Sequence, residues 1–189
     1  TSEDWARRLR YACFAQLCKE GIDRVATAHT ANDQAETLLL RLARGTGLHG
    51  AGGIRPRRGV YLRPLLELTR QDTEQFCRET GQQWVTDETN ATDAYARNRL
   101  RSAAVPALQS TNTAAVENLA HFCEKAAQAD VYFAQKAQQL LTIARLTAAQ
   151  AADMPARARA ARQCGWPVWR LEDLAAADEL ILEAAMHSL

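Results

Sequence analysis

Residues Ile22 to Leu42 read IDRVATAHTANDQAETLLLRL, and this stretch decides the fold. Its first seven residues include β-branched side chains and predict a short buried strand of a parallel sheet. Either Thr30 or Asn32 is a suitable cap for a helix that runs to Leu42, and Gly45 ends that helix. A helix, a strand and a second helix in succession form one turn of a doubly wound sheet, so the sequence predicts an α/β fold.

Hydrophobic spacing predicts further elements on both sides of this unit. Five of the nine glycines fall between Gly45 and Gly53 and predict a loop. A change of composition near residue 145 indicates a domain change, and the chain beyond residue 93 is predicted to be helical. Helices are expected at 3–19, 69–80, 93–104, 112–145, 147–164 and 171–187, a strand at 60–66, and a turn at 87–90.

The composition is that of a globular protein, with 189 residues, 47% hydrophobic and 24% charged. No apolar run approaches the length of a membrane span, and the N-terminus has no apolar core of a signal peptide. The five cysteines are scattered and form no C-x-x-C pair, which argues against a zinc site or a disulfide framework and favours free, buried thiols in a cytosolic protein. The first methionine is Met154, so we expect the chain to be a fragment.

Arginine is concentrated in one part of the chain. Six arginines and no acidic residue lie between Arg41 and Arg63, and arginine outnumbers lysine 20 to 3 overall. The planar guanidinium binds phosphate with two hydrogen bonds, so this pattern favours a nucleotide or nucleic acid partner. A GC-rich genome would explain the ratio of arginine to lysine, but it would not explain the clustering.

The start of the central helix carries the strongest candidate site. Asp33 and Glu36 are three residues apart and share a face, with His29 and Asn32 nearby. Open α/β sheets bind ligands at the carboxyl ends of their strands, and two carboxylates there could hold Mg²⁺. The alternative is structural: Thr30 and Asp33 form a capping box, and Glu36 favours the helix dipole.

The segment from Gly45 to Gly50 matches G-x-G-x-x-G, but it follows a helix, whereas the dinucleotide-binding motif follows a strand. That interpretation is therefore rejected. The glycines allow close approach of the backbone to a ligand, and the flanking arginines suggest RNA. An ordinary flexible loop is the alternative.

Two pairs of arginines are candidates for phosphate binding. Arg97 and Arg101 are one helical turn apart and could form a phosphate clamp, or they could belong to a solvated helix face. Arg7 and Arg10 lie in the first helix, where one arginine could stabilise a nucleotide phosphate. A surface arginine without a ligand is the alternative for this pair.

In their order and spacing, these segments resemble the tRNA(Ile)-lysidine synthetases. The resemblance covers about residues 3–108 and rests on an Arg-x-x-Arg-Tyr helix, a T-A-H-x-x-x-D-Q-A-E-T segment, and further short motifs downstream. The matching segments are Arg7–Tyr11, Thr27–Thr37, Arg44–Gly50, Arg63–Leu66 followed by Arg70, Trp84–Asn90 and Tyr95–Arg101.

The resemblance implies part of a Rossmann-like parallel sheet domain of the adenine-nucleotide alpha-hydrolase type, followed by a mainly α-helical region. Residues 1–110 would be the C-terminal part of the catalytic domain, 111–145 a long helical linker, and 146–189 the start of a helical second domain. The implied enzyme is cytoplasmic, uses ATP and Mg²⁺, and acts on tRNA(Ile) with a CAU anticodon and free L-lysine. It adenylates C2 of the wobble cytidine, and lysine then displaces AMP to form lysidine. A homodimer is left open.

The resemblance also implies roles for individual side chains. Asp33 and Glu36 would position metal and substrate, with His29 alongside, and Asp33 would orient the lysine amine or accept its proton. Arg7 and Arg10 would contact the nucleotide. The arginines expected to bind tRNA are Arg41, Arg44, Arg63, Arg97 and Arg101.

One family motif does not occur in the chain. The ATP-binding loop S-G-G-x-D-S should precede the first helix, and none of the serines lies beside a pair of glycines. We therefore expect no ATP–pyrophosphate exchange by this chain alone. Two alternatives are a non-catalytic RNA-binding remnant and, less favoured because it needs paired cysteines, an enzyme that thiolates tRNA cytidine.

Overall fold

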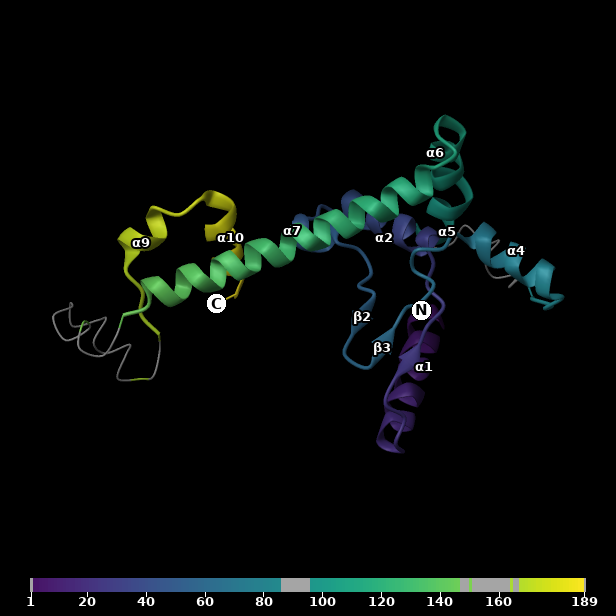
Figure 1. Ribbon diagram of the computed structural model, residues 1–189, viewed down its shortest axis with the longest axis horizontal. Coiled ribbons are helices and arrows are strands. Elements are labelled where there is room, and N and C mark those ends of the chain that lie inside the picture. Colours follow the sequence, from purple (N-terminus) through teal and green to yellow (C-terminus); the bar gives the residue numbers. More distant parts are fainter. Residues whose placement is uncertain (1, 86–95, 147–149, 151–163, 165–166, 189) are drawn as a thin grey trace. The chain divides into compact units, whose positions relative to one another are not determined.

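The computed structural model describes residues 2–85, 96–146, 150, 164 and 167–188 (Figure 1). The chain divides into two compact units, Thr1–Ala127 and Gln128–Leu189, which are described separately. The predicted turn at 87–90 and most of the predicted helix at 147–164 lie outside the described residues. The domain limits expected from the sequence stay predictions.

Helices dominate the first unit. Its elements in chain order are α1 (Ser2–Lys19), β1 (Val25–Ala26), α2 (Ala31–Ala43), α3 (Leu48–Ala51), β2 (Arg57–Arg58), β3 (Tyr61–Leu62), α4 (Arg70–Thr80), α5 (Ala96–Arg99), the π-helical turn η2 (Leu100–Ala104), α6 (Val105–Thr111) and the first part of α7 (Ala115–Ala144).

The sheet has three short strands in the order β1-β3-β2. Strands β1 and β3 are parallel, with Val25 opposite Tyr61, whereas β2 is antiparallel to β3. The predicted parallel pair is therefore present, but the strands are shorter than the predicted ranges and the sheet is small. At Pro64 no N–H is available to continue the ladder of β3.

Helix α1 packs on this sheet through aromatic rings. The rings of Tyr11 and Tyr61 meet edge to face with centroids 5.1 Å apart, and Phe14 lies 6.3 Å from the same Tyr61 ring. Such aromatic pairs contribute more than their buried area alone. The predicted first helix is thus confirmed, and its aromatic face joins it to β3.

The glycine-rich segment was predicted to be a loop, but it contains the short helix α3. Its last glycines lie against α7: a Cβ at Gly52 would be 3.2 Å from Ala127 Cα, and one at Gly53 would be 3.0 Å from Cys123 Sγ. Gly53 also has a φ of 61°, which disfavours any side chain. The glycines therefore bring the backbone close to another helix, in the core formed by Leu38, Ala51, Cys123 and Ala126.

Helix α4 has the ends that the sequence predicts. Thr69 is its N-cap, and Asp72 Oδ2 accepts hydrogen bonds of 2.7 Å from both the backbone N–H and the hydroxyl of Thr69. Gly81 ends the helix in the left-handed conformation, with a φ of 70°. These caps are local in sequence, which explains why the sequence predicted them.

The second unit contains the rest of α7, α9 (Leu171–Ala175) and α10 (Glu179–Ser188). The single helix predicted over 171–187 is wrong: Asp178 Oδ1 accepts a 3.0 Å hydrogen bond from the Leu180 N–H and starts a second helix. The indole of Trp169 donates to Leu141 O at 3.0 Å, beside a core of Ala137, Leu141 and Ala185. The long helix predicted at 112–145 is confirmed as α7.

All five cysteines are free, as expected, but only Cys123 is buried. Burial raises the pKa of the Cys123 thiol, so this side chain behaves as a small apolar residue. Cys13 and Cys164 are exposed, so the prediction of buried thiols was wrong for them. Within the described parts of the chain, no helix is both long and apolar enough to cross a bilayer.

Gly53 and Gly59 have nearly the same φ, so comparing alanine substitutions at the two positions separates the cost of packing at Gly53 from the cost of its backbone conformation. Gly53→Ala should lower the free energy of unfolding by more than the roughly 1–2 kcal/mol that a left-handed residue costs, because its Cβ also meets Gln34 Oε1 and Cys123 Sγ. Gly59→Ala, with a φ of 60° and no neighbour within 4 Å, should show the backbone cost alone. Urea unfolding of both variants checks this, and equal losses would contradict the packing described for Gly53.

The cap of α4 should depend on pH. The hydroxyl and backbone N–H of Thr69 lower the pKa of Asp72, so the cap is fully formed above the usual aspartate pKa of about 3.9 and is lost as the pH falls through the lower folded value. NMR titration should show Asp72 protonating below the normal range. Thr69→Val should move the pKa of Asp72 up, whereas Thr69→Ser should leave it low.

Candidate active site

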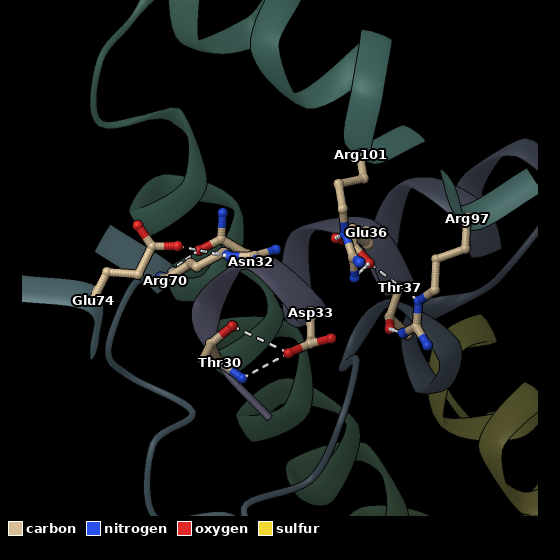
Figure 2. A network of polar contacts seen from close by, with 9 residues as sticks. All are labelled: Thr30, Asn32, Asp33, Glu36, Thr37, Arg70, Glu74, Arg97 and Arg101. Carbon is tan, nitrogen blue, oxygen red and sulfur yellow. Dashed lines mark hydrogen bonds and ion pairs between the residues drawn. The ribbon is translucent and has the colours of Figure 1, made fainter. Parts of the chain in front are cut away.

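A cavity of about 260 Å³ lies where β1 leads into α2. This is the carboxyl end of a parallel strand, where open α/β sheets bind ligands. The polar residues of this site come from α2, α4, α5 and η2, and Figure 2 shows the polar contacts among them. The cavity is lined by Ala28, Thr30, Asn32, Asp33, Glu36, Arg70 and Arg101.

Asp33 has one oxygen engaged by the chain and one that is not. Its Oδ2 accepts hydrogen bonds from the Thr30 N–H at 2.9 Å and from the Thr30 hydroxyl at 3.1 Å (Figure 2). Thr30 is the N-cap of α2, so the predicted capping contact exists. Within the part of the chain that the structure describes, Oδ1 accepts no hydrogen bond, so this oxygen is available to a ligand in the cavity.

Glu36 lies one turn further along α2 and is only 2% exposed. Arg101 binds it with two hydrogen bonds, from Nε to Oε1 at 2.7 Å and from Nη2 to Oε2 at 3.0 Å. Arg97 adds an ion pair of 3.2 Å between Nε and Oε2, and its Nη2 donates to Thr37 Oγ1 at 2.9 Å. A carboxylate buried this deeply requires such compensation, because desolvating an unpaired charge is costly.

These contacts decide how well the two carboxylates fit Mg²⁺. The ion binds through oxygen atoms in a near-octahedral arrangement, usually with one or two carboxylates and several waters. Both oxygens of Glu36 already accept from guanidinium groups, so the pair does not fit as a two-carboxylate site in this arrangement. Of the two carboxylates, only Asp33 keeps an oxygen, Oδ1, that the described chain leaves free for the ion.

The contact between Asn32 and Arg70 was missed in the sequence-based site. Asn32 Oδ1 accepts a 2.7 Å hydrogen bond from the backbone N–H of Arg70, which is the first residue of α4. The side chain of Arg70 lines the cavity and also binds Glu74 at 3.0 Å (Figure 2). The sequence signal that could have indicated this contact is the position of Arg70 directly after the helix cap Thr69, although Asn32 is 38 residues away.

Of the three other arginines predicted to bind tRNA, Arg41 and Arg63 donate hydrogen bonds within the protein and Arg44 does not. Arg41 Nη1 donates to the backbone oxygens of Gly50 at 2.6 Å and Gly53 at 3.0 Å. Arg63 is 9% exposed, and its Nη1 donates to Arg55 O at 2.8 Å. Arg44 is exposed at the end of α2.

The remaining predicted site residues are not brought into the cavity by the described structure. His29 Nδ1 lies 2.9 Å from Thr27 Oγ1, and His29 is absent from the cavity lining of the described residues. Arg10 is exposed on α1, and the side chain of Arg7 lies outside the described part of the chain. The structure therefore brings Asp33, Glu36 and Arg101 together at the cavity and pairs Arg97 with Glu36. The chemical roles of all these residues stay predictions.

The cavity contains both positively and negatively charged side chains, so it suits an anionic ligand group and an amine. Arg70 and Arg101 line the cavity with guanidinium groups that are already paired with Glu74 and Glu36, and guanidinium groups bind phosphate or carboxylate oxygens. Asp33 presents a carboxylate oxygen that can accept a hydrogen bond or a proton from an amine. Such an arrangement can hold an anionic group and an amine at the same time.

The Glu36 ion pairs should matter to stability far more than an exposed pair. Glu36→Ala should lower the free energy of unfolding by about 3 kcal/mol, the lower end for a broken buried pair, because both arginines are 31% exposed and can reach water. Glu74→Ala removes an exposed pair with Arg70 and should cost about 0.5 kcal/mol or less. Urea unfolding gives both values; equal losses would show that the buried pair does not hold α2 to α5 and η2.

A family model described as a PP-loop domain matches residues 1–108. The tRNA(Ile)-lysidine synthase of Clostridium perfringens is 39% identical over 142 residues, covering 72% of this chain and 29% of that protein. The corresponding enzyme of Solibacter usitatus is 44% identical over 142 residues, covering 73% and 32%. That of Parasynechococcus marenigrum is 40% identical over 137 residues, covering 67% and 40%.

The chain thus spans about a third of the length of the curated relatives it matches. The matched residues include every side chain that lines the cavity. The resemblance seen in the sequence is therefore confirmed, and the chain belongs to the PP-loop domain family.

Proposed function

We propose that this chain supplies part of the active site of an enzyme that uses ATP to join lysine to C2 of the wobble cytidine of tRNA(Ile). The relatives are named tRNA(Ile)-lysidine synthases, and the matched family is a PP-loop domain. The observation that carries the proposal is the cavity at the end of β1, which Asp33, Arg70 and Arg101 line together.

The reaction has two steps that need different groups. The C2 oxygen of cytidine attacks the α-phosphorus of ATP, a P–O bond forms, and pyrophosphate leaves. Developing negative charge on phosphate is stabilised by preorganised cations, and the candidates in this proposal are Arg70 and Arg101, which line the cavity. The first step turns a poor leaving group into AMP.

The second step forms the C–N bond. The ε-amine of lysine attacks C2, the C2–O bond breaks, and AMP leaves with the bonding electrons. The amine must be neutral when it attacks and must lose a proton afterwards. In this proposal Asp33 Oδ1 orients that amine and accepts the proton, and the proposal is supported by the engagement of the other oxygen, Oδ2, with Thr30. Mg²⁺, when bound, would neutralise phosphate charge in the first step, with Asp33 as its candidate protein ligand, and Asp33 Oδ1 would serve the amine in the second step only when it does not hold the ion.

Glu36 has a different role in this proposal. Its carboxylate is occupied by Arg97 and Arg101, so it acts as a positioning residue that keeps Arg101 at the cavity wall. The predicted catalytic and metal-binding roles are therefore kept for Asp33, and Glu36 acts through the arginines.

The chain offers a matched test of Asp33. In the whole protein that carries this sequence, Asp33→Asn should lower the rate of lysidine formation by roughly 100-fold or more, the contribution typical of a positioned acid or base. Asp72→Asn is the control, because Asp72 holds the same cap position in α4 and does not line the cavity. Mass spectrometry of tRNA(Ile) measures lysidine.

Equal rates in the Asp33→Asn and Asp72→Asn proteins would contradict the role of Asp33, because both variants weaken a helix cap in the same way. A whole protein that binds tRNA(Ile) but forms no lysidine would instead favour the RNA-binding remnant.

A further inference from the structure

The six arginines between Arg41 and Arg63 divide into two groups in the structure. Arg41, Arg55 and Arg63 donate hydrogen bonds to backbone oxygens of the protein itself. Arg44, Arg57 and Arg58 are exposed, and their side chains form no hydrogen bond or ion pair with the described parts of the chain. The clustering seen in the sequence therefore mixes arginines that hold the fold together with arginines that remain available.

Arg57 and Arg58 constitute strand β2, the antiparallel edge of the sheet (Figure 1). Consecutive side chains of a strand point to opposite faces, so the two guanidinium groups flank the edge on both sides. Gly59, with a φ of 60°, makes the turn into β3. No acidic residue lies between Glu36 and Glu67, so no carboxylate of the hairpin competes for these cations.

The hairpin that carries the two arginines is held firmly at its base. The backbone N–H of Arg63 donates to Pro56 O at 2.9 Å, and Arg63 Nη1 donates to Arg55 O at 2.8 Å. Arg55 Nη1 in turn lies 3.4 Å from Ala127 O on α7. Because both arms of the hairpin are tied to each other and to a helix, the edge presents its two charges in a defined place.

We infer that the Arg57–Arg58 edge is a contact surface for the sugar-phosphate backbone of RNA. Guanidinium groups bind phosphate oxygens well, and each phosphate that an arginine neutralises releases counterions condensed on the RNA. Strand β2 is two strand spacings, about 10 Å, from β1, whose end opens into the cavity. An RNA whose reacting base enters the cavity can therefore place a flanking phosphate on this edge.

This inference rests on the proposed function for the identity of the RNA, and it adds residues that the predicted tRNA-binding set does not contain. A different explanation is that charged residues on an edge strand only prevent pairing with other chains. The two explanations differ in what the arginines do to RNA affinity.

The test uses the 189-residue chain and a labelled RNA hairpin with a CAU loop. Fluorescence anisotropy gives the dissociation constant between about 50 and 200 mM NaCl, where phosphate contacts have a strong salt dependence. The variant is Arg57→Gln/Arg58→Gln. The control is Arg8→Gln/Arg78→Gln, which removes the same charge from exposed positions on α1 and α4.

Loss of two phosphate contacts should reduce the slope of log affinity against log salt by about 1.4 to 1.8. The control should keep the slope of the unchanged chain, and Arg57→Lys/Arg58→Lys should keep most of it because lysine retains the charge. A second RNA with the same stem and a different loop should show the same reduction, since the contact is to phosphate.

Several results would overturn the inference. These are an unchanged slope in the Gln variant, an equal reduction in the control, or no RNA binding by the unchanged chain at low salt. Self-association of the Gln variant without a change in RNA slope would assign the arginines to edge protection alone. Lysidine formation in the whole protein is measured separately, so its absence would remove the proposed function without removing a measured slope difference.

Discussion

The first unit depends on the compensation of one buried charge, the carboxylate of Glu36. Its position on α2 removes it from water, and the free-energy cost of that burial requires cations with well-placed hydrogen bonds. Arg97 and Arg101 supply them from α5 and η2, more than 60 residues away in the sequence. The η2 turn is a π-helix, a rare element that is often found at functional sites. The ion pairs therefore position one wall of the cavity as well as joining the helices.

The same compensation separates the two acids that the sequence presents as a pair. Glu36 has both oxygens engaged, whereas Asp33 uses one oxygen for the helix cap and keeps the other toward the cavity. Two carboxylates three residues apart thus differ in whether an oxygen is left to bind a ligand. The capping contact is part of this difference, because it holds the Asp33 side chain in one orientation at the start of α2.

The sequence predicted interactions between residues that are close along the chain, and it did not predict those between distant residues. The cap of α4 by Thr69 and its end at Gly81 involve neighbours within a few residues, and they were predicted. The common face of Asp33 and Glu36 follows from helical spacing and was also predicted. The pairing of Glu36 with Arg101 joins residues 65 apart, and the contact of Gly53 with α7 joins residues 70 apart. No local pattern encodes such contacts, so the arginines were assigned to RNA and the glycines to a loop.

The arginines show that residue type alone does not identify a binding surface. Arg41 and Arg63 were natural candidates for tRNA because they belong to an acid-free, arginine-rich stretch. Their hydrogen bonds to backbone oxygens satisfy groups that short helices and tight turns leave without partners, which is a sufficient reason for their presence. Availability to a partner is decided by what each charged group already contacts. By that criterion, Asp33 of the two site acids and Arg44, Arg57 and Arg58 of the arginine-rich stretch are groups that the described protein leaves open.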